Sequence, residues 1–163
     1  MKTLMLLAVC LMVSACDYTV PLASTPEETI NRNLLGLWEN TKTGDQHERL
    51  LILPLNAREF LVSYPAGNDD AMFAKASLVT RAGLQLAQLE WIGTAKGKQP
   101  DDNRVYQLAT YSLNASNLTV RMLNSDVVDK AITNSAGLAT AIAKHKDETD
   151  LFRDPMVFTK QDK

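Results

Sequence analysis

From residue 35 onward the chain alternates short apolar runs with clusters of turn residues. Runs of this length, bounded by Gly, Asn, Asp and Pro, are typical of antiparallel β-strands. The pattern predicts about seven strands in a meander, over residues 35–39, 48–53, 59–64, 72–78, 84–91, 104–113 and 118–123. A further run at 156–159 follows Pro155, which suits the beginning of a strand, and predicts a final strand after the late helices.

The run at 84–91 changes its phase. Leu84 and Leu86 share one face of an extended chain, whereas Leu89 and Trp91 share the opposite face. This pattern predicts either a bulge near Ala87 or a strand that is buried on both faces.

Helical spacing appears mainly near the end of the chain. Asn134 or Ser135 caps a helix predicted over 135–146, in which Leu138 and Ile142 share a face. A shorter helix is predicted near 125–132, and another begins at Thr25-Pro26-Glu27-Glu28, which fits a capping box. We therefore expect a mainly β fold with late helices (α+β), either a closed barrel or an open antiparallel sheet packed by those helices.

The first fifteen residues have the order of a secretory signal peptide. Lys2 precedes an apolar run at 3–13, which is too short to span a bilayer, and the small residues Ser14 and Ala15 lead to Cys16. Cys10 is a poorer cleavage site because the branched Val9 precedes it.

Val13-Ser14-Ala15-Cys16 resembles the lipobox of bacterial lipoproteins. The resemblance implies removal of residues 1–15 and acylation of Cys16, with palmitate-type chains that anchor the protein to the cell membrane on its periplasmic side without spanning it. In enterobacterial lipoproteins an aspartate at the next position favours the inner membrane, and Asp17 stands there; the outer membrane is the alternative. Residues 16–25 contain Pro21 and lack periodicity, so we expect a lipidated cysteine and a tether, followed by a single domain over 26–163.

Composition narrows the function classes. Removing 15 of 163 residues leaves 148, enough for one domain with a sizeable core. The whole chain carries a formal charge of −2, both signs are scattered, and no basic patch indicates nucleic acid. Cys16 would be the only cysteine after cleavage, so no disulfide is expected.

No motif for catalysis, metal binding or cofactor binding is found in the chain. His47 and His145 lack ligand spacing, and the Gly-rich and nucleophile-elbow motifs are missing. The pairs Asp69-Asp70 and Asp101-Asp102 lie in turns, where aspartate bonds its own backbone. We expect no metal and no cofactor.

Gly36-Leu37-Trp38 resembles the Gly-x-Trp motif of lipocalins and lipocalin-like barrels. The resemblance implies a tryptophan that closes one end of the barrel beneath a basic side chain of the last strand, here Arg153 or Lys160. Aromatic residues on the predicted strands would then either line a ligand cavity or fill the core. These residues are Trp38, Phe60, Tyr64 and Trp91.

The resulting expectation is a membrane-anchored, non-enzymatic binding or assembly module of the cell envelope, whose ligand is a small hydrophobic molecule or an envelope protein. Two alternatives stay open. One is an envelope hydrolase with a site assembled from dispersed residues, namely His47, Glu90, Tyr106 and Asp126. The other is an inhibitor or immunity-type lipoprotein that binds a protein through an exposed apolar patch.

Overall fold

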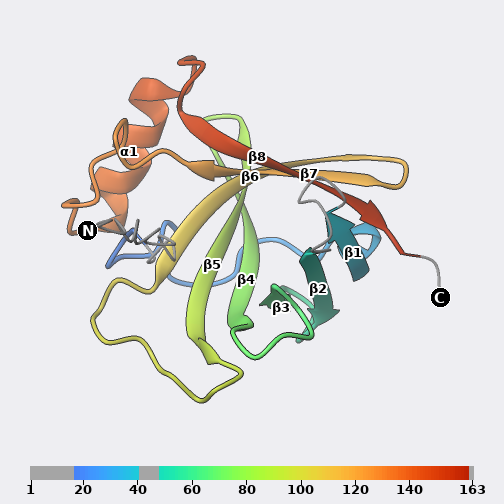
Figure 1. Cartoon of the computed structure of the whole chain (residues 1–163). Coiled ribbons are helices and arrows are strands. Elements are labelled where there is room, and N and C mark those ends of the chain that lie inside the picture. The colour runs from blue at the N-terminus through green and yellow to red at the C-terminus, as the bar shows by residue number, and fades with distance from the viewer. Residues whose placement is uncertain (1–16, 41–47, 162–163) are drawn as a thin grey trace, which may run out of the picture.

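The computed structural model describes residues 17–40 and 48–161, and shows a closed antiparallel barrel (Figure 1). Each strand pairs with the next along the chain, and the last strand returns to the first. The strands are β1 (Gly36–Asn40), β2 (Glu48–Pro54), β3 (Glu59–Tyr64), β4 (Met72–Arg81), β5 (Leu84–Thr94), β6 (Tyr106–Asn114), β7 (Asn117–Leu123) and β8 (Phe152–Lys160). The predicted antiparallel meander with a late helix and a final strand is confirmed, and the sheet is closed rather than open.

The barrel closes where β8 meets β1. Trp38 lies opposite Lys160 and Glu39 opposite Thr159, and the Gln161 backbone N–H donates to the Leu37 carbonyl at 2.9 Å. Gly36 begins β1 with φ +128°, and a Cβ atom there would lie 3.3 Å from Cε of Lys160. The backbone angle favours glycine at this position, and an added Cβ would also displace the flexible end of the Lys160 side chain slightly.

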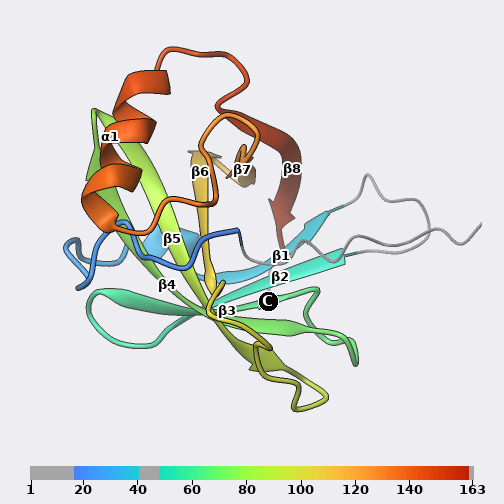
Figure 2. The ribbon, with the colours of Figure 1, turned by 90° about the vertical axis from the view of Figure 1, so that its left-hand side faces the viewer.

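The side chains of the barrel form two separate cores. One fills the interior, and its largest members are Trp38, Phe60 and Phe158, which are at most 2% exposed. The second lies outside the barrel, between α1 (Ser135–His145) and the wall formed by β4, β5 and β6. Figure 2 shows α1 across the ends of β4 and β5. Both faces of these strands are therefore buried along part of their length.

This arrangement explains the change of phase in β5. Leu86 belongs to the outer core beneath α1, whereas Ala87 and Leu89 pack against the interior core. Of the two predicted alternatives, the strand buried on both faces is correct. The register shift in this hairpin lies elsewhere, between Phe73 and Ala74 on β4.

The predicted helix at 135–146 is confirmed as α1. The Asn134 side chain accepts the Gly137 backbone N–H at 2.7 Å, which caps the first turn. Leu138 and Ile142 are fully buried against the barrel, and each contributes about 1.5–3 kcal/mol through burial.

Two other predicted helices are wrong. Residues 125–131 form consecutive turns, because the side chains of Asn124 and Asp129 bond backbone N–H groups two residues ahead and divide the segment. No helix begins at Thr25 either, since Glu27 bonds Arg81 and Glu28 bonds Thr80. The carboxylates that would cap the helix are bound to β4, and only the 3-10 turn η1 (Arg32–Leu34) forms nearby.

Candidate functional site: the strap, the polar groove and the apolar wall

Residues 17–28, which we call the N-terminal strap, lie against the outside of the barrel. The Asp17 backbone N–H donates to Oε1 of Gln107, and Nε2 of Gln107 donates to the Asp17 carboxylate, both at 3.3 Å. Tyr18 and Tyr106 exchange two backbone hydrogen bonds of 3.1 and 3.0 Å, as one residue pair of an antiparallel sheet. The predicted tether is therefore wrong from Asp17 onward.

Tyr18 is the deepest residue of the strap. Its side chain is fully buried in the outer core, and its hydroxyl donates to the Val128 carbonyl at 2.8 Å. Burial raises the pKa of this hydroxyl far above its ordinary range, and the nearby Asp17 charge acts in the same direction. Tyr18 therefore remains a hydrogen-bond donor.

Gln88 of β5 holds the middle of the strap. Its Oε1 accepts the backbone N–H groups of Leu22 and Ala23 at 2.5 and 2.9 Å, and its Nε2 donates to the Ala23 carbonyl at 3.0 Å. Gln88 is itself buried. A buried amide that satisfies three backbone groups fixes the segment much as a paired strand would.

The far end of the strap reaches β4 and β3. The Arg81 guanidinium binds both carboxylate oxygens of Glu27, at 2.5 and 2.8 Å, and this hydrogen bonding lowers the pKa of Glu27. Arg58 donates to the Pro26 carbonyl at 3.2 Å. The strap therefore crosses the outer face of the barrel from β6 to β3.

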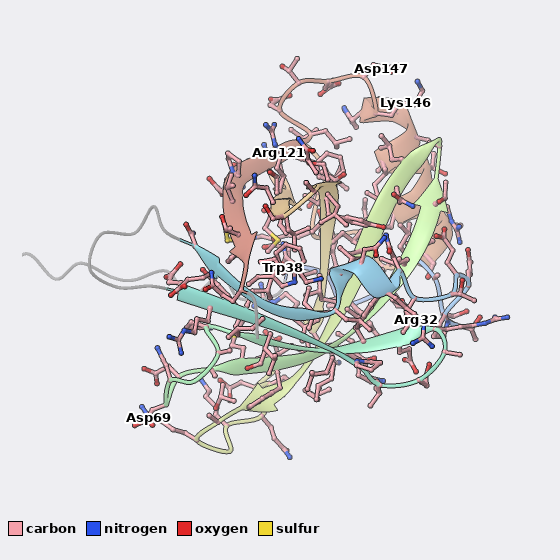
Figure 3. The ribbon with its side chains drawn as sticks, turned by 90° about the vertical axis from the view of Figure 1, so that its right-hand side faces the viewer. Arg32, Trp38, Asp69, Arg121, Lys146 and Asp147 are labelled. Atoms are coloured by element: carbon pink, nitrogen blue, oxygen red, sulfur yellow. The ribbon has the colours of Figure 1, made fainter. Side chains whose placement is uncertain are left out.

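Trp38 is fully buried in the interior core, beside the last strand. Its Nε1 donates to the Leu34 carbonyl at 2.9 Å, and Nζ of Lys160 lies 5.0 Å from the centre of its ring. Lys160 also donates to the Asn33 carbonyl at 3.0 Å. Of the two predicted partners, Lys160 is correct, whereas Arg153 pairs with Asp126. Figure 3 places Trp38 inside the barrel, among its side chains.

The four predicted cavity residues do not share one environment. Trp38 and Phe60 are buried in the interior core, and Tyr64 packs at the edge of that core, edge-on to Phe158 with ring centres 5.9 Å apart. The Tyr64 hydroxyl donates to Glu48. Trp91 belongs to neither core, and its Nε1 donates to the Gly93 carbonyl at 2.9 Å. Trp38 and Phe60 are therefore packed in the core, whereas Tyr64 and Trp91 are only partly buried.

A polar groove of about 220 Å³ lies on the outside of the barrel, between the strap and β3–β6. The register places Lys75, Glu90 and Tyr106 side by side on three neighbouring strands. Other side chains of β3–β5 complete its floor, and the strap forms its wall. The floor also includes Glu59, Ala76, Ser77 and Gln88, and the wall consists of Pro21, Ala23, Ser24 and Pro26.

The groove brings together two of the four residues predicted for an assembled enzyme site. Glu90 and Tyr106 both line it, and Glu90 forms an ion pair of 2.9 Å with Lys75. Asp126 is not part of the groove and pairs with Arg153 at 2.9 Å, while His47 lies outside the described residues. Sequence reasoning missed Lys75, which only the pairing of β4 with β5 places beside Glu90. It also missed Gln88, whose partners lie in the strap.

The ionisation states of Lys75 and Tyr106 in the groove follow from their burial and from their proximity to Glu90. The hydrogen bond that Lys75 donates to the Glu90 carboxylate raises the pKa of Lys75. Burial raises the pKa of Tyr106, and the Glu90 charge adds to this effect. At neutral pH Lys75 is therefore charged and Tyr106 is protonated.

A second feature, which we call the apolar wall, consists of Leu53, Leu61, Phe73 and Ile92 on the outer face of β2–β5. Leu53 lies opposite Leu61, and Leu61, Phe73 and Ile92 line a shallow hollow of about 380 Å³ with Lys98 and neighbouring loop residues. Leu53 and Ile92 are 42% and 44% exposed. Leu61 lies opposite Lys75, so the apolar wall borders the polar groove.

Cys16, the predicted lipidation site, lies outside the described residues, whereas Asp17 lies at the start of the strap. Within residues 17–40 and 48–161, no three His, Cys, Asp or Glu side chains are grouped so that they could hold a metal ion. The same described part of the chain contains no helix with the length and hydropathy needed to cross a membrane.

Comparison with protein-family models, with curated proteins and with solved structures finds no match for this chain. Function is therefore inferred from the strap, the polar groove and the apolar wall.

Proposed function

We propose that the protein is a lipid-anchored, non-enzymatic binding module of the bacterial cell envelope that holds a protein partner on its apolar wall. The anchor is the acylated Cys16 that the lipobox implies, and Asp17 favours the inner membrane. The observation that carries the binding role is the exposure of Leu53 and Ile92 beside Leu61 and Phe73 on one outer face.

This surface has the composition of a protein interface. Apolar side chains lie at its centre, and the Lys75–Glu90 ion pair and the polar groove lie along its border. Protein interfaces combine an apolar centre with a polar rim that supplies hydrogen bonds. A partner that covered the hollow would remove exposed leucine, isoleucine and phenylalanine surface from water, at about 25 cal/mol per Å².

The tight burial of the interior aromatic side chains argues against a carrier of small hydrophobic molecules. Trp38, Phe60 and Phe158 are at most 2% exposed, so they pack against one another and their neighbours instead of lining an open space. Lipid-sized ligands need an enclosed cavity of at least about 300 Å³ lined by apolar side chains. Binding at the outer face needs no such space.

An envelope hydrolase is supported less well by the polar groove. A general base must be able to accept a proton near neutral pH, and a lysine nucleophile must be able to lose one. Lys75 and Tyr106 have raised pKa values, and the Glu90 carboxylate is already bound to Lys75. These groups fit the rim of a binding surface better than the centre of an active site.

The partner is tested by photo-crosslinking in native membranes. A photoreactive residue at position 92 of the full-length chain is expected to give one adduct of defined mass. The same residue at the exposed Ser116, on the β6–β7 turn, should give none. Leu53→Asp should abolish the adduct while leaving the circular dichroism and melting temperature unchanged. Equal crosslinking at both positions, or an adduct that survives Leu53→Asp, contradicts the proposal.

The anchor is tested on the purified full-length protein. Intact-mass spectrometry should report a chain that begins at Cys16 and carries acyl groups, and Cys16→Ser should move the protein out of the membrane fraction. A Cys16→Ser variant that stays stably bound to membranes would overturn the anchor.

A further inference from the structure

We infer that the barrel sits directly on the bilayer surface in one fixed orientation, with the side that carries α1 and the turns at 125–131 toward the lipid. The inference rests on the proposed acylation of Cys16. It goes beyond that proposal by naming which side of the barrel faces the membrane. It follows from the small number of residues between Cys16 and the first residue that is hydrogen-bonded to the barrel.

The described chain is fixed to the barrel from its first residue, Asp17. Asp17, the residue after Cys16, exchanges two hydrogen bonds with Gln107, and Tyr18 is paired with Tyr106 and fully buried. One residue of chain spans at most about 3.6 Å. A flexible tether of about ten residues would instead allow a typical separation of about 17 Å. Acyl chains on Cys16 would therefore hold the barrel against the headgroups.

The start of the strap identifies the side that meets the membrane. The Tyr18 hydroxyl bonds Val128 in the turns at 125–131, and Tyr18 shares the outer core with Leu138 and Ile142 of α1. Figure 2 shows the start of the described chain, in dark blue, on the same side as α1. The β6–β7 turn extends to the opposite side of the molecule (Figure 1).

Charge attraction to the lipid does not explain this orientation. The orientation should therefore not change with salt concentration. Lys130, Lys144 and Lys146 are exposed on or beside α1, but Asp129 and Asp147 are exposed next to two of them. A surface of mixed sign gains little from anionic lipids, and salt screens that gain further. The position of the acylated residue is what fixes the side.

The test uses thiol accessibility in the full-length, acylated protein. Lys130→Cys and Ala143→Cys place thiols on the α1 side, and Ser116→Cys places one on the opposite side, all at exposed positions. In proteoliposomes, a membrane-impermeant maleimide should label the first two several-fold more slowly than in detergent, at low and high salt alike. Ser116→Cys should react equally fast in both.

A second variant separates the orientation from the anchor. An insertion of about ten Gly and Ser residues between Cys16 and Asp17 should restore rapid labelling of Lys130→Cys while the protein stays in the membrane. Equal labelling of both sides in an acylated, membrane-bound protein without the insertion would overturn the orientation alone. A chain without acyl groups, or one that needs no Cys16 for membrane binding, would remove the anchor and the orientation together.

Discussion

At the scale of single residues, two tyrosine hydroxyls in the same protein have opposite surroundings. The Tyr18 hydroxyl donates to the Val128 carbonyl, whereas the buried Tyr111 hydroxyl has no hydrogen-bond partner among the residues that the structure describes. Removal of the Tyr18 hydroxyl deprives the buried Val128 carbonyl of a hydrogen bond. Tyr18→Phe should therefore lower the free energy of unfolding by about 1–3 kcal/mol. Urea denaturation measures this change.

Tyr111→Phe is the matched control, because it deletes the same atom. An unpartnered buried hydroxyl costs free energy in the folded state, so this variant should be neutral or more stable by about 1 kcal/mol. If Tyr111→Phe loses as much stability as Tyr18→Phe, the change in stability does not depend on whether the deleted hydroxyl had a hydrogen-bond partner, and the prediction is wrong.

At the scale of elements, the Gln88 side chain holds the middle of the strap on the barrel. Gln88→Ala removes three hydrogen bonds to Leu22 and Ala23, worth about 1 kcal/mol each. We expect the strap to open locally before the barrel unfolds. Amide hydrogen exchange at Leu22 and Ala23 should become about a hundredfold faster, while exchange in the interior of β3 changes little.

Gln85→Ala on the same strand serves as the control, since that side chain is exposed. It should leave exchange at Leu22 and Ala23 unchanged. If Gln88→Ala instead speeds exchange in β3 as much as in the strap, the strap and the barrel open as one unit and the prediction is wrong.

The same elements show what the sequence could predict. Strand positions followed from alternation and turn residues, and β3 is found at its predicted bounds, Glu59–Tyr64. The helix at 135–146 followed from a cap and two apolar residues at helical spacing. These signals are local, and local patterns are sufficient where one face of an element is buried.

The strap and the groove could not be predicted in this way. Residues 17–25 lack periodicity because they are held by Gln88, about 65 residues further along the chain, rather than by a repeating pattern of their own. Lys75, Glu90 and Tyr106 become neighbours only through strand register. The segment 125–132 had helical spacing, but the Asn124 and Asp129 side chains favour turns. Contacts of this kind depend on the closed barrel, which no short stretch of sequence encodes.

At the scale of the whole molecule, all four tyrosines make the barrel sensitive to alkaline pH. Burial raises the pKa values of Tyr18, Tyr64, Tyr106 and Tyr111, and Glu48 and Glu90 add to the effect at Tyr64 and Tyr106. In the unfolded chain these hydroxyls have pKa values near ~10. Above that pH the unfolded chain loses protons that the folded barrel keeps, so stability is fully present below pH ~10 and falls as pH rises.

The expected slope is up to about 1.4 kcal/mol per pH unit for each tyrosine that stays protonated in the fold. Urea unfolding between pH ~9 and ~11, with tyrosinate absorbance followed in parallel, measures it. Lys75 adds to the same trend, because Glu90 raises its pKa. The contribution of a tyrosine to the slope must therefore be measured separately. Tyr18→Phe should reduce the slope by one tyrosine's share, even though that variant is less stable at neutral pH. If tyrosinate absorbance appears in the folded protein at pH ~10 and the urea midpoint stays flat, the tyrosines are not shielded from solvent as the two cores require.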